Sequence, residues 1–347
     1  MHSFSKLRST VVSISIFACA SLVGLGSSTQ IDSELEAAAA PSAELEQESP
    51  PLSGVVLPPG GRPVYGSFLT AAGVTGVAGE AEGESVPVAQ QPPLAGNQVV
   101  AFYGKPGAAS MGILGEYSKE QLSPLLEGYA RLYDDANGPL GVVPAFYLVY
   151  GTCWPEGEIG LLSRSVTESY IEFAAERGWM VFLDHQLGKY GVEASVRSML
   201  PFLRYSNVHL AIDPEWRTLK PMEEIGYISG AELNEAQRLM DDYLRENDFP
   251  GNRMLVVHQF RSTMIRDMTS VKASFERVVL VHTADGFGSP SLKRSTYAYN
   301  ARAMNMPVKG FKLFFESKVK GAGWDKPLMR PDEVLALDPV PLVIMYQ

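Results

Sequence analysis

The sequence from residue 98 onward predicts an α/β fold built from repeated strand-helix units. Short runs of β-branched and aromatic residues alternate there with longer segments in which apolar residues have helical spacing. This alternation is typical of parallel sheets, in which a crossover helix follows each strand. Eight strands and seven crossovers within residues 98–347 match a (β/α)8 TIM-type barrel, whose last strand closes the cylinder. An open doubly wound sheet is the alternative, but no dinucleotide fingerprint follows the first strand.

The individual elements can be placed from their lengths and from the residues at their ends. The predicted strands are apolar runs too short for helices, at residues 99–104, 142–151, 180–186, 208–213, 254–259, 278–282, 310–315 and 342–346. The predicted helices lie between them, at residues 119–135, 166–177, 192–204, 231–247, 263–275, 290–304 and 331–337. Ser118 and Gly178 are start and stop signals, and Ser229 with Glu232 has the spacing of a capping box.

Residues 1–29 have the layout of a signal peptide. Lys6 and Arg8 precede an apolar run that ends in small residues. The run is shorter than the roughly 18 apolar residues expected of a membrane span, so export is expected, with an uncleaved anchor as the alternative. Cys19 resembles the lipidation site of bacterial lipoproteins. We therefore expect a secreted or cell-envelope-anchored protein that contacts a membrane only through this segment.

Residues 30–97 are rich in Pro, Gly, Ala and Glu and lack sustained periodicity, which predicts a disordered linker. This segment contains nine acidic residues and one arginine, so it holds most of the formal charge of −10. The barrel region has no basic excess, which argues against nucleic acid as a partner. Cys153 is the only cysteine besides Cys19, so the fold is expected to depend on a core and not on disulfides.

Polar residues close almost every predicted strand, and in a barrel of this kind the carboxyl ends of the strands meet at the face where chemistry occurs. These residues are Tyr103, Asp184, His185, Gln186, Asp213, Glu215, His258, Gln259, His282, Asp285, Glu316 and Tyr346. Any one of them has a structural explanation, as a helix N-cap or as a hydrogen-bonded core residue. Acids from four strands would nevertheless converge on one cavity, and clustered carboxylates raise one another's pKa, which allows a general acid to work near neutral pH.

Three tryptophans also fall in loops after predicted strands. Trp154, Trp216 and Trp324 follow the second, fourth and seventh strands. They could form flat apolar surfaces on which sugar rings stack, or they could only cover the top of the barrel.

The Asp-x-Glu pattern of Asp213 and Glu215 is similar to the acid-bearing strand of chitinase-like and phage-type lysozyme-like glycosidase barrels. An acid after the fourth strand that faces one after the seventh, here Glu215 and Glu316, looks like the large clan of retaining glycosidases. This chain has Pro214 where that clan usually has Asn before its acid. Residues 98–347 further resemble uncharacterised exported bacterial barrel proteins, which implies a fold and no activity.

The leading hypothesis is a hydrolase that acts on a carbohydrate such as a cell-wall glycan. Glu215 would be the general acid, Glu316 or Asp184 the nucleophile or base, and Asp213 would tune Glu215. Residues expected to bind the substrate are Tyr103, Gln186, His258, Gln259, Asp285, Trp216 and Tyr346. Neither a cofactor nor a metal ion is implied in this hypothesis.

Two alternatives remain open. In the first, a metal-dependent hydrolase, His185, His258 and His282 would join Asp184, Asp213 or Asp285 around a divalent ion. In the second, the barrel binds a glycan or a protein at the cell surface without catalysis. A cavity whose carboxylates are all paired with Arg or Lys would favour this second alternative.

Overall fold

The computed structural model describes residues 94–319 and 321–347, so the predicted signal segment, Cys19 and nearly all of the predicted linker lie outside the described residues. Within the described chain, eight parallel strands pair in a closed ring, because β1 pairs with both β2 and β11. The strands of the ring are β1 (Asn97–Gly104), β2 (Gly141–Cys153), β4 (Met180–His185), β5 (Val208–Ile212), β7 (Arg253–Gln259), β9 (Val278–Ala284), β10 (Val308–Leu313) and β11 (Val343–Tyr346). This confirms the predicted barrel and excludes the open sheet.

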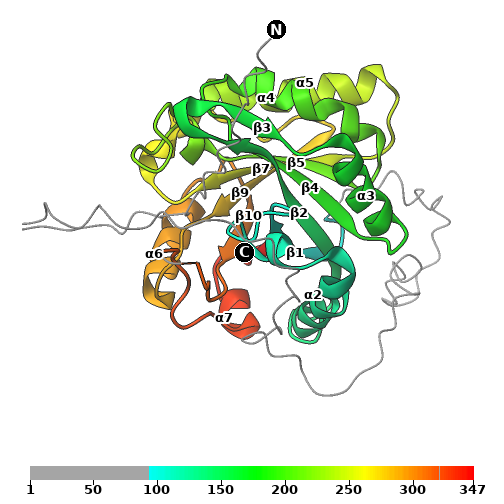
Figure 1. Cartoon of the computed structure of the whole chain (residues 1–347), viewed down its shortest axis with the longest axis vertical. Coiled ribbons are helices and arrows are strands. Elements are labelled where there is room, and N and C mark those ends of the chain that lie inside the picture. The colour runs from blue at the N-terminus through cyan, green and yellow to red at the C-terminus, as the bar shows by residue number, and fades with distance from the viewer. Residues whose placement is uncertain (1–93, 320) are drawn as a thin grey trace, which may run out of the picture.

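Helices surround this barrel (Figure 1). They are α2 (Lys119–Asp134), α3 (Arg164–Ala175), α4 (Val192–Met199), α5 (Gly230–Glu246), α6 (Pro290–Ala301) and α7 (Pro331–Leu335), with a short α1 (Ile113–Glu116) after β1. Ser118 and Ser229 are the N-caps of α2 and α5, and each forms a complete capping box. The smaller elements are β3 (Ile159–Leu161), β6 (Ile228–Ser229), β8 (Ile265–Arg266) and 3-10 turns at Pro155–Gly157, Leu200–Arg204, Pro214–Trp216, Ser262–Met264 and Met268–Ser270.

The helix predicted at residues 263–275 is wrong. Met264, Met268 and Val271 have helical spacing, which is why the sequence indicated a helix there. The segment instead forms two 3-10 turns separated by the short strand β8, which pairs with β6. Asp267 adopts a left-handed backbone conformation with φ of 50°, which interrupts any helix through this point. Long-range strand pairing therefore outweighs the local pattern.

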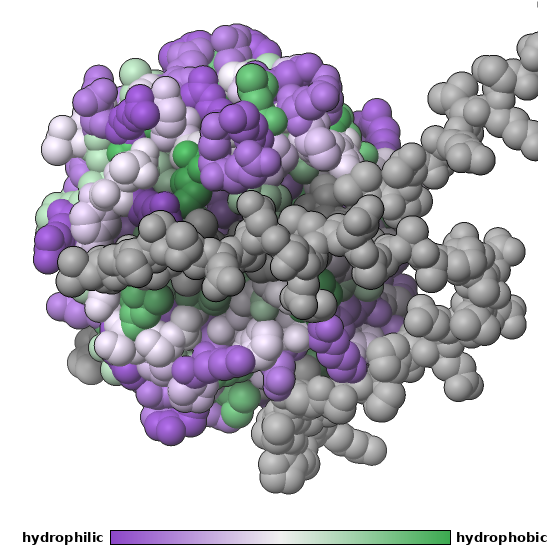
Figure 2. Space-filling view, turned by 60° about the vertical axis from the view of Figure 1, so that its left-hand side comes forward, coloured by the Kyte–Doolittle hydropathy of each residue, from purple (hydrophilic) through white to green (hydrophobic). Residues whose placement is uncertain are grey.

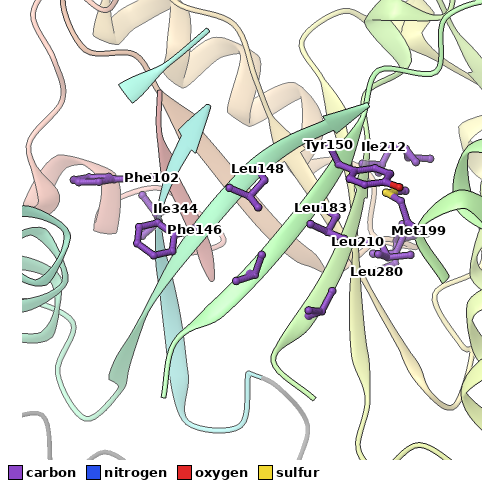
Figure 3. Close-up of a cluster of buried hydrophobic side chains, with 14 of the residues drawn as sticks. Phe102, Phe146, Leu148, Tyr150, Leu183, Met199, Leu210, Ile212, Leu280 and Ile344 are labelled. Atoms are coloured by element: carbon purple, nitrogen blue, oxygen red, sulfur yellow. The ribbon is translucent and has the colours of Figure 1, made fainter. Parts of the chain in front are cut away.

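Side chains alternate between two cores along each barrel strand, as the period of two in a β-strand requires. On β2, Ala145 and Tyr147 belong to an inner cluster that fills the barrel, whereas Phe146 and Leu148 belong to an outer cluster. Figure 3 shows part of the outer cluster, in which Leu148 lies beside Leu183, its partner on the neighbouring strand β4. Toward the carboxyl ends of the strands, the inward-facing positions hold the polar residues of the site described below.

The surface outside these cores is mainly hydrophilic on the face in Figure 2, with separate hydrophobic spots. The large apolar side chains that are exposed, such as Met304 and Leu219, are scattered along the described chain. None of the described helices combines the length and the apolar character needed to cross a bilayer.

Candidate active site

A cavity of about 430 Å³ opens at the carboxyl ends of the strands. Strand β1 contributes Tyr103 to its lining, the turn after β5 contributes Asp213 and Glu215, the end of β9 is followed by Asp285, and β10 contributes Lys312. Charged residues that line it are Glu116, Asp213, Glu215, Asp285, Glu316, Lys312 and Lys318. Asp213, Glu215, Asp285 and Glu316 thus line one cavity, whereas Asp184, the acid expected there from the third predicted strand, does not line it.

Asp285 is held by two basic side chains. Its Oδ2 lies 3.0 Å from Nδ1 of His258 and 3.3 Å from Nζ of Lys312. On the other side of the imidazole ring, Nε2 of His258 lies 2.8 Å from the hydroxyl oxygen of Tyr147. The side chains of His258, Lys312 and Asp285 are all nearly inaccessible to solvent. This buried chain of contacts fixes both the position and the charge of the Asp285 carboxylate.

Asp184 belongs to a second contact group and does not itself line the cavity. Its Oδ2 accepts a hydrogen bond of 2.8 Å from the hydroxyl of Tyr103, and Nε2 of His258 lies 3.8 Å away. Its other oxygen, Oδ1, is buried and has no hydrogen-bond partner among the described residues. The ammonium of Lys312 lies 3.8 Å from the centre of the Tyr103 ring, which links this group to Asp285.

Asp213 and Glu215 reach the cavity from the 3-10 turn Pro214–Trp216, which directly follows β5. Asp213 is the N-cap of this turn, and its Oδ1 accepts a hydrogen bond of 3.2 Å from the backbone N–H of Glu215. Pro214 occupies the first position of the turn, where its missing N–H costs nothing. The Glu215 carboxylate forms no hydrogen bond or ion pair with any described residue. Glu215 is therefore an acid of the cavity lining, just after β5, whose carboxylate is not held by another side chain.

The environments of these acids push their pKa values in opposite directions. Burial, together with the nearby charges of Asp213 and Asp285, raises the pKa of Glu215 well above its usual value. Burial and the charges of Asp184 and Asp285 raise the pKa of Asp213 to about 7. Burial would also raise the pKa of Asp285, but the charge of Lys312 and the hydrogen bond from His258 outweigh it and lower this pKa.

Protonation of His258 is favoured by the same cluster. Burial alone would lower the pKa of His258, but the charge of Asp184 and the hydrogen bond with Asp285 raise it. Burial is also the largest cause that raises the pKa of Asp184. The cavity therefore combines an ionised carboxylate, Asp285, with carboxyl groups that retain a proton at higher pH.

Of the other predicted residues, some line the cavity and some do not. Glu316 lies in the cavity wall and is exposed, beyond the end of β10. Gln186 and Trp216 line the cavity, and Oε1 of Gln186 accepts a hydrogen bond of 2.8 Å from the backbone N–H of Cys153. Trp154 is not a lining residue of this cavity.

Among the predicted residues that lie outside the cavity, four occupy outward positions of their strands: His185, Gln259, His282 and Tyr346. The Tyr346 hydroxyl lies 2.7 Å from that of Tyr133 in the outer layer, and Gln259 bonds to Nε2 of His282 at 2.7 Å. His185 follows the inward-facing Asp184 and is buried with its Nδ1 unpartnered among the described residues. Tyr346 and Gln259 therefore do not contact a ligand in this cavity, and the three histidines His185, His258 and His282 do not converge.

Two residues of the site were missed in the sequence. Lys312 and Tyr147 sit at inward positions of β10 and β2, in line with inner-cluster residues. The signal for Lys312 was available, because a lysine within a buried apolar strand is rarely tolerated without a partner. Tyr147 lies in a continuous apolar run and gave no comparable signal.

The cluster also contains one set of atoms with the spacing of a metal site. Asp213, His258 and Asp285 each offer a ligand atom, and these atoms lie within 4.8 Å of one another. Two carboxylates and an imidazole suit Zn²⁺ or a similar divalent ion. Both ring nitrogens of His258 already have partners, Asp285 and Tyr147, so a metal ion would have to displace one of them.

No protein-family model matches the chain, and no curated protein matches it. Among solved structures, a chitinase from Chromobacterium violaceum is similar at 9% identity over 62% of this chain and 68% of that one, with a TM-score of 0.34. Endo-glycoceramidase II from Rhodococcus sp. is 13% identical over 72% of each chain, with a TM-score of 0.38. A putative alpha-L-fucosidase from Bacteroides thetaiotaomicron is 9% identical over 78% of this chain and 90% of that one, also with a TM-score of 0.38. Identities this low leave the function to be argued from the site.

Proposed function

We propose that the chain is a hydrolase that acts on a carbohydrate, with Glu215 as general acid and Asp285 as the ionised carboxylate. One observation supports this more than any other. A carboxyl group with a raised pKa and a carboxylate with a lowered pKa line the same cavity. Cleavage of a glycosidic bond requires this combination, because one group must give a proton while the other is already charged.

In the proposed reaction, Glu215 protonates the leaving oxygen of the glycosidic bond. Asp285 either attacks the anomeric carbon or removes a proton from the attacking water. Lys312 and His258 keep Asp285 ionised through their contacts of 3.3 Å and 3.0 Å. Asp213 has a ligand oxygen within 4.8 Å of one on Asp285, and its charge is a cause of the raised pKa of Glu215. Asp213 therefore helps Glu215 to retain its proton.

The cavity walls are suited to a sugar ring. Trp216, Phe260, Phe287 and Phe314 line the cavity around the acids, and aromatic rings offer flat apolar surfaces to the C–H faces of sugars. Gln186 and the acids supply polar groups at the edges. Export through residues 1–29, with residues 30–97 as a linker, belongs to this proposal and is supported by the layout of the sequence.

The test is a hydrolysis screen with purified protein on glucans, mannans, xylans, chitin fragments and peptidoglycan. Glu215→Gln should lower turnover of any cleaved glycan by at least about a thousandfold, because it removes the transferable proton without changing side-chain size. Glu276→Gln, an exposed glutamate outside the cavity, is the matched control and should retain full activity. Wild-type turnover in the Glu215→Gln variant would reject the assignment.

A metal-dependent hydrolase is the second candidate, and it is favoured by the spacing of Asp213, His258 and Asp285. A divalent ion at these residues would activate a water molecule and polarise the substrate. Metal analysis of the purified protein, followed by activity measurements after chelation and metal return, separates the two candidates. A stoichiometric ion whose removal abolishes turnover would replace the acid-base proposal.

A further inference from the structure

A second groove of about 390 Å³ adjoins the cavity and is formed by the loop between β10 and α7. The cavity and the groove share two lining residues, Phe315 and Glu316. The groove continues past them along Trp324 and Lys326. A molecule that fills the cavity can therefore extend into the groove without leaving the protein surface.

A buried ion pair fixes the loop that forms this groove. Nζ of Lys293 lies 3.2 Å from Oδ2 of Asp325, and both side chains are almost fully buried. The same ammonium donates to the backbone carbonyl oxygens of Gly286 at 2.8 Å and of Lys312 at 2.6 Å. Asp325 in turn accepts the backbone N–H of Phe314 at 3.0 Å. The groove is thus tied to the same two segments that carry Asp285 and Lys312.

The groove offers groups that recognise a sugar. Trp324 is partly exposed, and the ammonium of Lys326 lies 3.7 Å from the centre of its ring. Lys326 is exposed, and a cation–π contact at an exposed site is weak, so an incoming sugar ring can displace it from the indole face at little cost. The displaced ammonium and the Glu316 carboxylate are then positioned to bond with sugar hydroxyls.

We propose that this groove is a subsite that binds the sugar units next to the bond that is cleaved. The inference rests on the proposed carbohydrate hydrolase and names its substrate class: a glycan chain of several units, not a single-sugar glycoside. The chain would run from the cavity floor, across Phe315 and Glu316, onto Trp324. Trp324 acts there as a binding residue and takes no part in bond cleavage.

The experiment compares wild type with Trp324→Ala on oligosaccharides of two to six units, taken from the β-1,4-glucose, β-1,4-mannose and β-1,4-N-acetylglucosamine series. For the longer members, Trp324→Ala should raise KM by about tenfold with kcat little changed, because a stacking contact of this kind contributes about that factor to binding. The two-unit members should be unaffected, since they do not reach the groove. Trp324→Tyr keeps a ring and should recover most of the affinity.

Trp154→Ala is the matched control. Trp154 also lies under a lysine, with Nζ of Lys105 5.3 Å from its ring, but it lines neither the cavity nor the groove. Its variant should behave as wild type at every chain length. Urea unfolding of each variant checks that the fold is intact. If Trp324→Ala does not fold, Trp324→Leu, which keeps an apolar side chain but removes the flat ring, takes its place, and the same rise in KM for the longer oligosaccharides is expected.

The outcomes separate the subsite from the function. If wild type cleaves a glycan and Trp324→Ala has the same KM as wild type at all lengths, or a loss that does not depend on length, the subsite is overturned and the function stands. The stacking role would also be overturned if Trp324→Tyr and a folded Trp324→Ala raised KM for long oligosaccharides equally. The glycan-binding proposal fails together with the function if two results are both found: wild type does not cleave these oligosaccharides, and the Glu215→Gln variant does not bind them in calorimetry.

Discussion

Replacing Asp213 with Asn is expected to stabilise the protein at alkaline pH, and the size of the effect follows from the burial of this carboxyl. Its pKa is about 7 in the folded chain, compared with the usual 3.8. A carboxyl whose folded pKa is raised favours folding fully only below the unfolded pKa, and this contribution is lost as pH rises through the folded pKa. At about 1.4 kcal/mol per pKa unit, wild type loses about 2 kcal/mol by pH 5 and about 4 kcal/mol by pH 8. Asn does not ionise, so Asp213→Asn avoids this loss.

Urea unfolding at several pH values between about 4 and 8 measures this difference in the free energy of unfolding. The stability of Asp213→Asn relative to wild type should rise with pH by up to about 4 kcal/mol. Asn keeps an oxygen that can accept the backbone N–H of Glu215, so the turn itself is preserved. A difference that stays constant across this pH range would refute the reasoning.

Asp285→Asn is the control with the opposite sign. The pKa of Asp285 is lowered by Lys312 and His258, so its contribution to stability is present above the unfolded pKa and is lost as pH falls through the lower folded pKa. Asp285→Asn should therefore destabilise the protein at neutral pH, because it leaves two buried basic groups without their counter-charge.

Three further substitutions test other parts of the site and the core. Lys312→Met should raise the pKa of Asp285, so the acid limb of the kcat/KM profile should move to higher pH; an unmoved limb would contradict the role of Lys312. Tyr103→Phe removes the hydroxyl that bonds to Asp184 and should lower the free energy of unfolding by about 1–3 kcal/mol in urea titrations, whereas a loss below about 0.5 kcal/mol would argue against that bond. Phe146→Ala empties a fully buried position of the outer core and should cost about 3–5 kcal/mol, and a smaller cost in calorimetry would indicate that the core collapses around it.

The barrel could be predicted from the sequence because each strand is a separate apolar run with a helix behind it. Strands β4 and β7 begin and end within one residue of the predicted bounds. The segment around Ile265 could not be predicted, since its structure depends on pairing with Ile228, which is distant in the chain. Local spacing of apolar residues contains no information about such a partner.

The site was predicted less completely, and the reason is the direction of side chains on each strand. Polar residues at strand ends were treated together, although the period of two sends neighbours to opposite sides. His258 faces inward and contacts Asp285, whereas the adjacent Gln259 bonds to His282 in the outer layer. Lys312 stands inside β10 and not at its end, so the pattern of polar residues at strand ends does not include it. Lys312 would have been identified by asking which positions of each strand face the barrel interior, as Tyr103 and Asp213 do.

The most direct test of the central claim is a carbon-13 NMR titration of the side-chain carboxyl groups in protein labelled at Asp and Glu. Glu215→Gln and Asp285→Asn assign the two signals by removing one each. Glu215 should titrate above its usual pKa of 4.5 and Asp285 below its usual 3.8, because burial raises the first pKa while Lys312 and His258 lower the second. A Glu215 signal that titrates near its usual 4.5 would contradict the proposed division of roles between the two acids.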